Sequence, residues 1–292
     1  MSNSNYVLYE YDKNLELILN TGFDIDGDRT GVGTKCLFGL NTKIDISKRI
    51  PILTKRKVVY QSIIKEFLWY VSGSNNANDL EKMGSKIWTP WRNKTFETKH
   101  NLGDGNLGYI YGFNLIHYGA SIYDSNPKGF NQLDFVINTL RNNPKSRQAV
   151  FSFYRPDTNN QAILPACHAM YHFIIRPDEN NNLTILDCSL FQRSADFPIG
   201  VGAGNLFIVS LFTYTIAQQL NLTPGYIYHS ASHCHVYHNA LESTTEYCNR
   251  DECPNSPILH LNYKPSIYDY TIDDFIVEDY NPLPAIKFPI AI

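Results

Sequence analysis

The sequence predicts an α+β fold in which helices pack on a large mixed β-sheet. Segments with the apolar spacing of a strand outnumber segments with the spacing of a helix, and most of them lie in the second half of the chain. Hydrophobic residues make up 43% of the 292 residues, which is enough for one sizeable core. Because no linker, internal repeat or low-complexity tract interrupts the chain, we expect a single domain over residues 1–292.

The helices are predicted from apolar residues that recur every three to four positions. Amphipathic stretches cover residues 7–21, 59–72 and 132–141, and the third stops before a proline, which cannot continue a helix. A more apolar run follows at residues 206–217. Ser and Thr interrupt this run and two glutamines end it, so we expect a short, buried central helix and not a bilayer span.

The strands are predicted from short apolar or alternating runs between turn signals. The first of them follows residues 26–33, whose Asp and Gly residues favour a loop. The predicted strands are residues 35–39, 148–154, 169–176, 183–192, 226–229, 235–237 and 258–263.

Composition argues against several classes of function. The net charge of −3 and pI of about 6.3 give no general attraction to nucleic acid or to a membrane, so an anion site has to be a local cluster of Arg and Lys. The six cysteines show no pairing pattern, and the first six residues lack the basic and apolar regions of a secretory leader. We therefore expect a cytoplasmic protein that binds neither nucleic acid nor a membrane.

Cys167 is the first candidate for chemistry. It lies in the run Leu164-Pro-Ala-Cys-His168, and the run Gln192-Arg-Ser-Ala-Asp196 follows in a predicted strand. A nucleophilic cysteine needs a nearby positive charge or hydrogen-bond donor to hold its thiolate. Arg193 could do this and also grip a phosphate. A lone cysteine is more often a small buried apolar residue, but the Arg-Ser-x-Asp run does not fit a plain core strand. The pattern indicates covalent catalysis on an anionic substrate.

Three loops could line a ligand site. Residues 28–33 could grip an anion with backbone amides and Arg29, although a solvated turn explains them almost as well. Residues 200–204 form a glycine-rich run before the apolar helix, but the neighbouring sequence does not support a dinucleotide site. Trp88 and Trp91 flank a proline in a third loop, where they either stack on a flat heterocycle or fill the core.

The histidines between residues 229 and 238 look at first like metal ligands. Together with Cys248 and Cys253 they lack the paired short spacings of a closed zinc site, so we expect no metal. His235 and Tyr237 are two residues apart and share one face of a strand. They are interpreted as hydrogen-bond donors to a ligand hydroxyl.

These motifs, in this order and spacing, match a known family: the chain resembles the thymidylate synthase family over nearly its whole length. The resemblance implies a thymidylate synthase-like fold that forms a homodimer through one face of its sheet. The matching stretches are Asp28–Gly33, Ser62–Trp69, Ile87–Trp91, Leu107–Gly112, Asn143–Arg147, Leu164–His168, Gln192–Asp196, His235–Tyr237 and Tyr280–Ile292.

The resemblance also implies a reaction: one-carbon transfer to C5 of a pyrimidine deoxynucleoside monophosphate, first of all reductive methylation of dUMP to dTMP. Cys167 would attack C6 of the ring, with Arg193 beside it, and C5 would then take the methylene of the cosubstrate 5,10-methylenetetrahydrofolate. The enolate that develops on the ring needs preorganised donors in a dry pocket. Glu66 would organise water and proton transfer, Tyr111 would help to remove the C5 proton, and His168 would belong to the same polar network.

Binding residues carried over from the family fall into two groups. The implied nucleotide-binding residues are Arg29, Arg147, Gln192, Arg193, Ser194, Asn205, His235 and Tyr237, of which Arg147 would act from the partner subunit. The implied folate-binding residues are Lys55, Ile87, Trp88, Trp91, Leu164, Asp196, Gly200 and Ala291. Ala291 would belong to a C-terminal lid that excludes water.

The chain departs from the family pattern at several positions. Gln148 stands where a second Arg is usual, Ala166 stands where Pro is usual, and His172 stands where Gln is usual. The usual Gly-Leu-Pro-Phe-Asn run appears as residues 200–205 with one extra residue. Asn205 would read O4 and N3 of uracil only if this loop rearranges.

Two other functions remain open. The first is hydroxymethyl transfer to dUMP or dCMP, in which water rather than hydride attacks the methylene intermediate. The altered loop and His172 favour it, whereas Trp88, Leu164 and the C-terminal lid favour methylation because they would shield the methylene from water. The second is a catalytically retired fold that binds nucleotide or RNA, against which the retained Cys167 and its partners argue.

Overall fold

The computed structural model describes residues 5–27 and 30–291. At its centre lies a six-stranded sheet in the order β1-β2-β6-β5-β4-β3. β5 and β6 run parallel, and the other neighbouring pairs run antiparallel. The predicted α+β fold with a large mixed sheet is therefore confirmed. The strands are β1 (Phe23–Ile25), β2 (Thr34–Asp45), β3 (Val150–Ser152), β4 (His168–Pro177), β5 (Leu183–Asp196) and β6 (Thr223–Tyr237).

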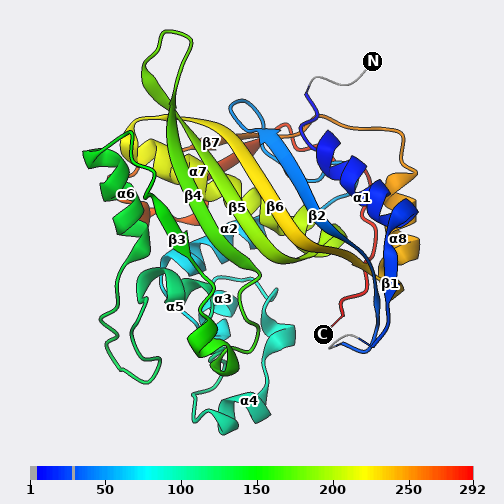
Figure 1. Ribbon diagram of the computed structural model, residues 1–292, viewed down its shortest axis with the longest axis horizontal. Helices are drawn as coiled ribbons and strands as arrows, with labels where there is room; N and C mark the ends of the chain where they lie inside the picture. The colour runs from blue at the N-terminus through cyan, green and yellow to red at the C-terminus, as the bar shows by residue number, and fades with distance from the viewer. Residues whose placement is uncertain (1–4, 28–29, 292) are drawn as a thin grey trace.

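Helices pack against one face and the edges of this sheet. α7 (Leu206–Leu220) connects β5 to β6 and lies behind them together with α2 (Tyr60–Val71), as Figure 1 shows. α1 (Tyr9–Thr21) lies beside β2 and packs against α8 (Leu241–Cys248), and α6 (Gln132–Asn142) lies beside β3. The other elements are α3 (Ala77–Lys82), α4 (Lys94–Lys99), α5 (Tyr111–Ile116), the 3₁₀ turn η1 (Thr89–Trp91), and the separate strand pair β7 (Ile258–Leu261) and β8 (Phe275–Glu278).

The predicted elements fall on observed ones, but the sequence underestimated the helices. α3, α4 and α5 have six residues each and α8 has eight, so none is long enough to show a clear apolar period. The two strands predicted at residues 226–229 and 235–237 are parts of one strand, β6. Polar residues between them, Ser230 and Ser232, broke the apolar pattern without breaking the strand.

The glycine-rich run after β5 was predicted as a loop, and this prediction was wrong. Phe197–Asn205 is a π-helical segment, here called the π segment, that continues directly into α7. The Asp196 side chain caps it by accepting a hydrogen bond from the Ile199 N–H at 3.4 Å. A π-helical turn holds one more residue than an α-helical turn needs, so it can absorb a residue without a bulging loop.

The π segment and α7 form one apolar helix, Phe197–Leu220, of 24 residues. Its mean hydropathy of 1.6 and its length would by themselves allow it to cross a bilayer, contrary to our estimate from the shorter apolar run. However, 72% of its most apolar window is buried inside the protein. The segment is therefore interpreted as the core helix that supports the sheet.

The face of the sheet away from α7 carries large apolar side chains that helices do not cover. We call the patch formed by Met170, Ile174, Phe191 and Tyr228 the open face. Each of these residues is between 40% and 43% exposed, and Met170 lies opposite Phe191 in the β4–β5 pairing. In Figure 1 these strands cross the front of the molecule with no helix over them. Four neighbouring exposed apolar side chains are typical of a surface that meets another protein.

We expect Gly202→Ala to destabilise the protein by about 1–3 kcal/mol, because it would overpack the contact between the π segment and α1. A Cβ at Gly202 would lie 2.2 Å from Oη of Tyr11, whose ring stacks on Phe197 at 5.8 Å. Gly200→Ala is the matched control, since its nearest neighbour would be Nδ2 of Asn205 at 3.4 Å. Urea unfolding should show the loss only for Gly202→Ala, and equal midpoints for the two variants would contradict the packing argument.

Candidate active site

Cys167 and Arg193 meet at the start of the β4–β5 pairing. The Arg193 N–H donates to the carbonyl oxygen of Cys167 at 3.0 Å, which extends the pairing by one residue beyond β4. The Arg193 guanidinium donates from Nε to the carbonyl of Ala166 at 2.9 Å and from Nη2 to that of Pro165. The same Nη2 lies 3.8 Å from Sγ of Cys167. A permanent positive charge is thus fixed beside a partly exposed thiol, as a nucleophilic thiolate requires.

Tyr111 forms a second wall of the thiol site. It is the first residue of α5, and its hydroxyl oxygen accepts a hydrogen bond from the Cys167 N–H at 2.9 Å. Burial raises the pKa of Tyr111 well above its ordinary value. The phenol therefore keeps its proton at neutral pH and can still donate it in a hydrogen bond.

Glu66 lies behind Tyr111 on the buried face of α2. Its carboxylate accepts hydrogen bonds from Tyr70 Oη at 2.8 Å and from Trp88 Nε1. Burial raises the Glu66 pKa, although both donors oppose this shift. A carboxyl group with a raised pKa inside an apolar wall is suited to taking up and releasing a proton. Trp88 in turn packs edge-on against Tyr111 with ring centroids 5.9 Å apart.

His168 lies one residue beyond the thiol and is fully enclosed. Its Nδ1 is 2.8 Å from the Tyr171 hydroxyl, and a hydrogen bond to the Asn205 side chain partly offsets the effect of burial. Burial lowers the His168 pKa to about 4, so its imidazole is neutral at physiological pH. Asn205 ends the π segment, which means that the extra residue in this segment does not move its side chain away from His168.

β5 and β6 carry a row of polar side chains on one face of the sheet. Ser194 is opposite His233 and Asp196 is opposite His235 in the parallel pairing. The ring of Tyr237 lies edge-on to His235 with centroids 5.0 Å apart. Because residues two apart on a strand share a face, these groups form one polar surface.

Gln192 lies on the same face of β5, and both polar atoms of its side-chain amide are hydrogen-bonded. Its Oε1 accepts from His229 Nε2 at 2.8 Å, and its Nε2 donates to the Ser194 carbonyl at 2.9 Å. Burial lowers the His229 pKa to about 3, so His229 stays neutral, and its Nδ1 has no hydrogen-bond partner among the described residues. The orientation of the Gln192 amide is therefore fixed before any ligand arrives.

Asp196 and the aromatic residues around residue 90 belong to the group predicted to bind the folate. Burial raises the Asp196 pKa to about 7, with Arg56 and the Ile199 N–H opposing the shift. Trp88 and Trp91 pack with ring centroids 5.6 Å apart. The side chains of Ile87 and Leu164 are half-buried and pack on the main core.

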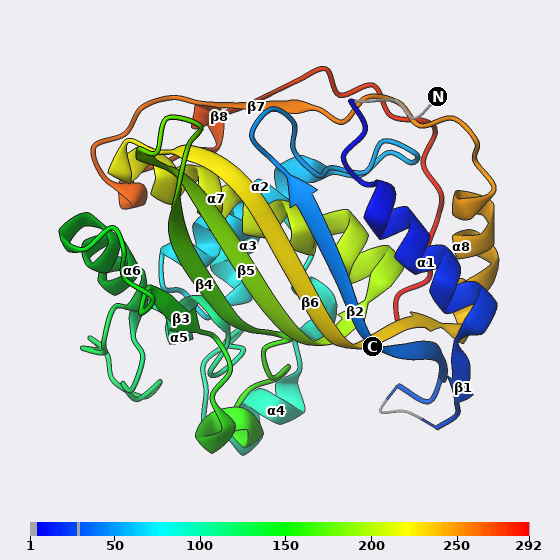
Figure 2. The same cartoon turned by 45° about the horizontal axis from the view of Figure 1, so that its top comes forward.

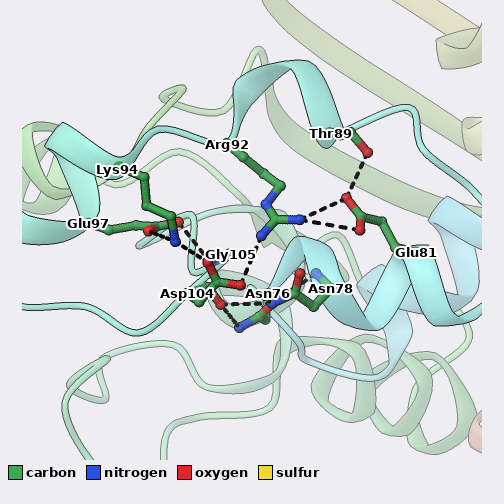
Figure 3. Close-up of polar contacts among 9 residues, drawn as sticks. All are labelled: Asn76, Asn78, Glu81, Thr89, Arg92, Lys94, Glu97, Asp104 and Gly105. Carbon is green, nitrogen blue, oxygen red and sulfur yellow. Dashed lines mark hydrogen bonds and ion pairs between the residues drawn. The ribbon is translucent and has the colours of Figure 1, made fainter.

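A network of charged and polar side chains fastens the segment that carries the two tryptophans (Figure 3). Arg92 follows η1 directly and donates to Glu81 of α3 at 3.3 Å and to Asp104 at 2.9 Å. Lys94 joins Asp104 and Glu97, and Glu97 accepts from the Gly105 N–H at 2.8 Å. Exposed ion pairs are individually weak, but a network of several holds a segment in one geometry.

The C-terminal segment is anchored across residues 54–56. The Leu283 N–H donates to the Thr54 carbonyl at 2.8 Å, and the Arg56 guanidinium lies 4.4 Å from the ring centre of Phe288. Arg56 also donates to the Pro198 carbonyl at 2.7 Å, so it links this tail to the π segment. Gly200 and Ala291 are both partly exposed, in the π segment and in the tail respectively.

Two predicted binding residues in the described part of the chain are not brought to this site. Lys55 is buried, with its ammonium 3.8 Å from Asp12 and 5.1 Å from the ring centre of Tyr247, in a separate cluster. Arg147 is exposed in the loop before β3, at the edge of the sheet. Arg29 lies outside the described residues. Of the others, Arg193 and Tyr111 contact Cys167 directly, and Trp88 links Tyr111 to Glu66. The roles of all the predicted residues in binding stay predictions.

Several residues of the site were not found from the sequence. Tyr70 is four residues after Glu66 on α2, a helical spacing that could have suggested their contact. Tyr171 is three residues after His168 on β4 and contacts it locally. His229 and Arg56 reach their partners across the sheet or between distant segments, for which the sequence carries no local signal. Within residues 5–27 and 30–291, no group of three His, Cys, Asp or Glu side chains is arranged to hold a metal ion.

The geometry defines the class of site: a thiol beside a fixed cation, with neutral and protonatable donors in a largely enclosed wall. Comparison with known proteins agrees, because the family model for thymidylate synthase matches residues 9–292. The chain is 33% identical over 291 residues to the thymidylate synthase of Herpesvirus ateles. This alignment covers 97% of the chain and 98% of the viral protein. It is 34% identical to the thymidylate synthase of Ascaris suum, in an alignment that covers 97% of this chain and 96% of the Ascaris protein. It is 33% identical to that of Homo sapiens, in an alignment that covers 97% of this chain and 90% of the human protein. The chain belongs to the thymidylate synthase family.

We expect Asp196→Asn to stabilise the empty protein at high pH. Because the folded-state pKa of about 7 is above the usual 3.8, the stability that Asp196 contributes is complete below pH 3.8 and is lost as the pH rises to about 7. Between pH 4 and pH 8, the free energy of unfolding of the variant should rise by about 1–3 kcal/mol relative to that of the native chain. Urea unfolding at both pH values measures this, with exposed Asp273→Asn as the control for loss of one charge. Parallel pH profiles for Asp196→Asn and the native chain would contradict the assignment.

Proposed function

We propose that this protein methylates dUMP to dTMP, with 5,10-methylenetetrahydrofolate as cosubstrate, through a covalent adduct at Cys167. The observation that carries the proposal is the 3.8 Å contact between the Arg193 guanidinium and the Cys167 thiol. Membership of the thymidylate synthase family and the names of its relatives support the same reaction. The folate supplies the methylene carbon and, for methylation, the hydride.

In this proposal Arg193 favours the thiolate of Cys167, which adds to C6 of the pyrimidine. A soft thiolate suits such a conjugate addition, and the enolate that develops needs donors that are already in position. Glu66, with its raised pKa, holds and passes protons at the base. Tyr111 keeps its phenolic proton and assists removal of the proton at C5.

The residues proposed to face the folate fit a flat, partly polar ring system. Trp88, Trp91 and Leu164 offer apolar surface, and Asp196, with a pKa of about 7, offers a carboxyl group that can accept or donate a hydrogen bond. The tail anchored near Arg56 is proposed to act as the lid that keeps water out. Exclusion of water favours hydride transfer over hydroxylation.

Hydroxymethyl transfer to dUMP or dCMP is the second candidate, because the π segment departs from the family pattern next to the base-reading Asn205. The contact between Asn205 and His168 supports the uracil-reading role in spite of the extra residue. The test is incubation of the purified protein with the folate and either dUMP or dCMP, and identification of the products by mass. A dTMP product with dihydrofolate supports methylation, whereas a hydroxymethylated nucleotide with tetrahydrofolate overturns it.

We further propose that the protein acts as a homodimer in the cytoplasm. The open face offers apolar surface for a second copy, and Arg147 lies exposed at the edge of the same sheet. His172 is the departure from the family pattern that favours hydroxymethylation. It lies on the open face, five residues along the chain from Cys167. Its Nε2 has no hydrogen-bond partner among the described residues. This position connects His172 with the proposed interface rather than with the base. The six thiols suit a reducing compartment.

Cys167→Ala should lower turnover of dUMP by more than about a thousand-fold, because no other group can form the adduct. Binding of dUMP, measured by calorimetry, should survive since the phosphate and sugar contacts remain. Cys253→Ala, which removes a partly exposed thiol elsewhere, is the matched control and should stay active. Unchanged turnover in Cys167→Ala would overturn the enzyme and favour a fold that only binds nucleotide.

The dimer is tested by mixing two inactive variants, Cys167→Ala and Arg147→Ala, under conditions that exchange subunits. If Arg147 serves the partner's site, each mixed dimer has one intact site, and random exchange should restore about one quarter of native activity. Sedimentation velocity reports the dimer independently. A sedimenting monomer, or no recovery although the subunits have exchanged, would contradict the proposal.

A further inference from the structure

Two histidines of β6 contact each other beside the proposed sugar-binding residues. His233 and His235 are two residues apart on one face of the strand, and their Nδ1 atoms are 3.1 Å apart. The ring centroids are 5.0 Å apart. His235 is buried, with 5% of its surface exposed, whereas His233 is half-buried. A nitrogen–nitrogen distance of this size is a hydrogen bond, so one ring donates and the other accepts.

The direction of this hydrogen bond follows from a second contact. Nδ1 of His235 also lies 3.3 Å from the carbonyl oxygen of His233. A carbonyl oxygen can only accept, so the proton lies on Nδ1 of His235 and is shared between two acceptors, the carbonyl and the ring of His233. His233 is therefore neutral with its own proton on Nε2. The Nε2 atom of His235 is left as an unprotonated acceptor.

We propose that His233 is a positioning residue that sets the tautomer of His235, so that Nε2 of His235 accepts a hydrogen bond from the 3'-hydroxyl of the nucleotide. This proposal rests on the proposed function for the identity of the hydroxyl. The Tyr237 phenol, edge-on to His235, donates to the same hydroxyl oxygen. The sequence alone suggests that His235 and Tyr237 both donate, an arrangement that would leave the hydroxyl proton without an acceptor.

An acceptor and a donor aimed at one point recognise a hydroxyl specifically. A hydroxyl group both gives and takes a hydrogen bond, so it satisfies Tyr237 and His235 together. A nucleotide without this hydroxyl offers neither hydrogen bond, which is how a site built to bind a hydroxyl strongly rejects an analogue that lacks it. His233 contributes to this discrimination without touching the nucleotide.

The first test is spectroscopic and needs no substrate. Protein labelled with ¹⁵N at histidine should give His235 the two-bond correlation pattern of the Nδ1–H tautomer at neutral pH, assigned with His235→Gln. In His233→Phe the acceptor ring is gone, and the pattern of His235 should shift toward a mixture of tautomers. The Nε2–H pattern in the native protein would overturn the proposal, even if the protein turns over dUMP.

The second test separates positioning from folding. His233→Phe should raise KM for dUMP about three- to ten-fold with kcat nearly unchanged, the range expected for one weakened hydrogen bond. His233→Asn is the conservative variant, since its Oδ1 can accept in place of the ring nitrogen, and it should restore KM to within about two-fold of native. A KM defect that Asn does not rescue, or a fall in kcat alone, would contradict a positioning role.

Substrates with and without the hydroxyl complete the design. With 2',3'-dideoxyuridine 5'-monophosphate, native and His233→Phe proteins should bind equally, because the contact that His233 supports is absent. If His233→Phe weakened binding of dUMP and of the dideoxy nucleotide by the same factor, the substitution would have a general structural effect, and the proposal would be overturned. Failure of the proposed function looks different: the native protein would then bind neither nucleotide, while the tautomer of His235 would still be as assigned.

Discussion

The three hydrogen bonds by which Arg193 holds the turn before β4 are the interaction on which the site depends. The guanidinium satisfies the carbonyls of Pro165 and Ala166, and the backbone N–H of the same residue satisfies that of Cys167. These bonds fix the last three residues before the strand, so the thiol cannot move independently of β5. The charge that favours the thiolate is thus placed by the same bonds that define the backbone of the nucleophile. A Lys in this position could supply the charge but not the forked set of donors.

Four ionisable groups of the candidate site are kept largely away from water. Burial raises the pKa of Glu66 and Asp196 and lowers that of His168 and His229, so each group is displaced toward its neutral form. Such groups reduce the stability of the empty protein, and the apolar core formed by α7 and the sheet has to offset this cost. The benefit is a wall of neutral donors and acceptors that requires no reorganisation when charge develops on a bound ring. His168, Tyr171 and Asn205 illustrate this, since each is already engaged with a neighbour.

The sequence was informative wherever a residue acts through its own chemistry or through a periodic pattern. The period of apolar residues predicted α1, α2, α6 and α7, and the residue types in the run around Cys167 were enough to indicate a candidate nucleophile. It was uninformative for contacts across the sheet. Nothing near residue 192 shows that His229 fixes the Gln192 amide, and nothing near residue 55 shows that the Lys55 ammonium is committed to Asp12. These contacts depend on strand register and on which segments fold back on each other, neither of which is encoded locally.

The π segment shows how an insertion can be compatible with an existing site. Between Asp196 and α7 this chain has one residue more than the family pattern, and glycines at positions 200, 202 and 204 suggested an irregular loop. In the structure the extra residue is wound into the helix, and Gly202 is needed because Tyr11 leaves no room for a side chain there. A loop would have allowed Asn205 to take many positions, whereas a helical backbone fixes it relative to α7 and keeps it beside His168. The π-helical backbone therefore holds the proposed base-reading residue, Asn205, in one position beside His168.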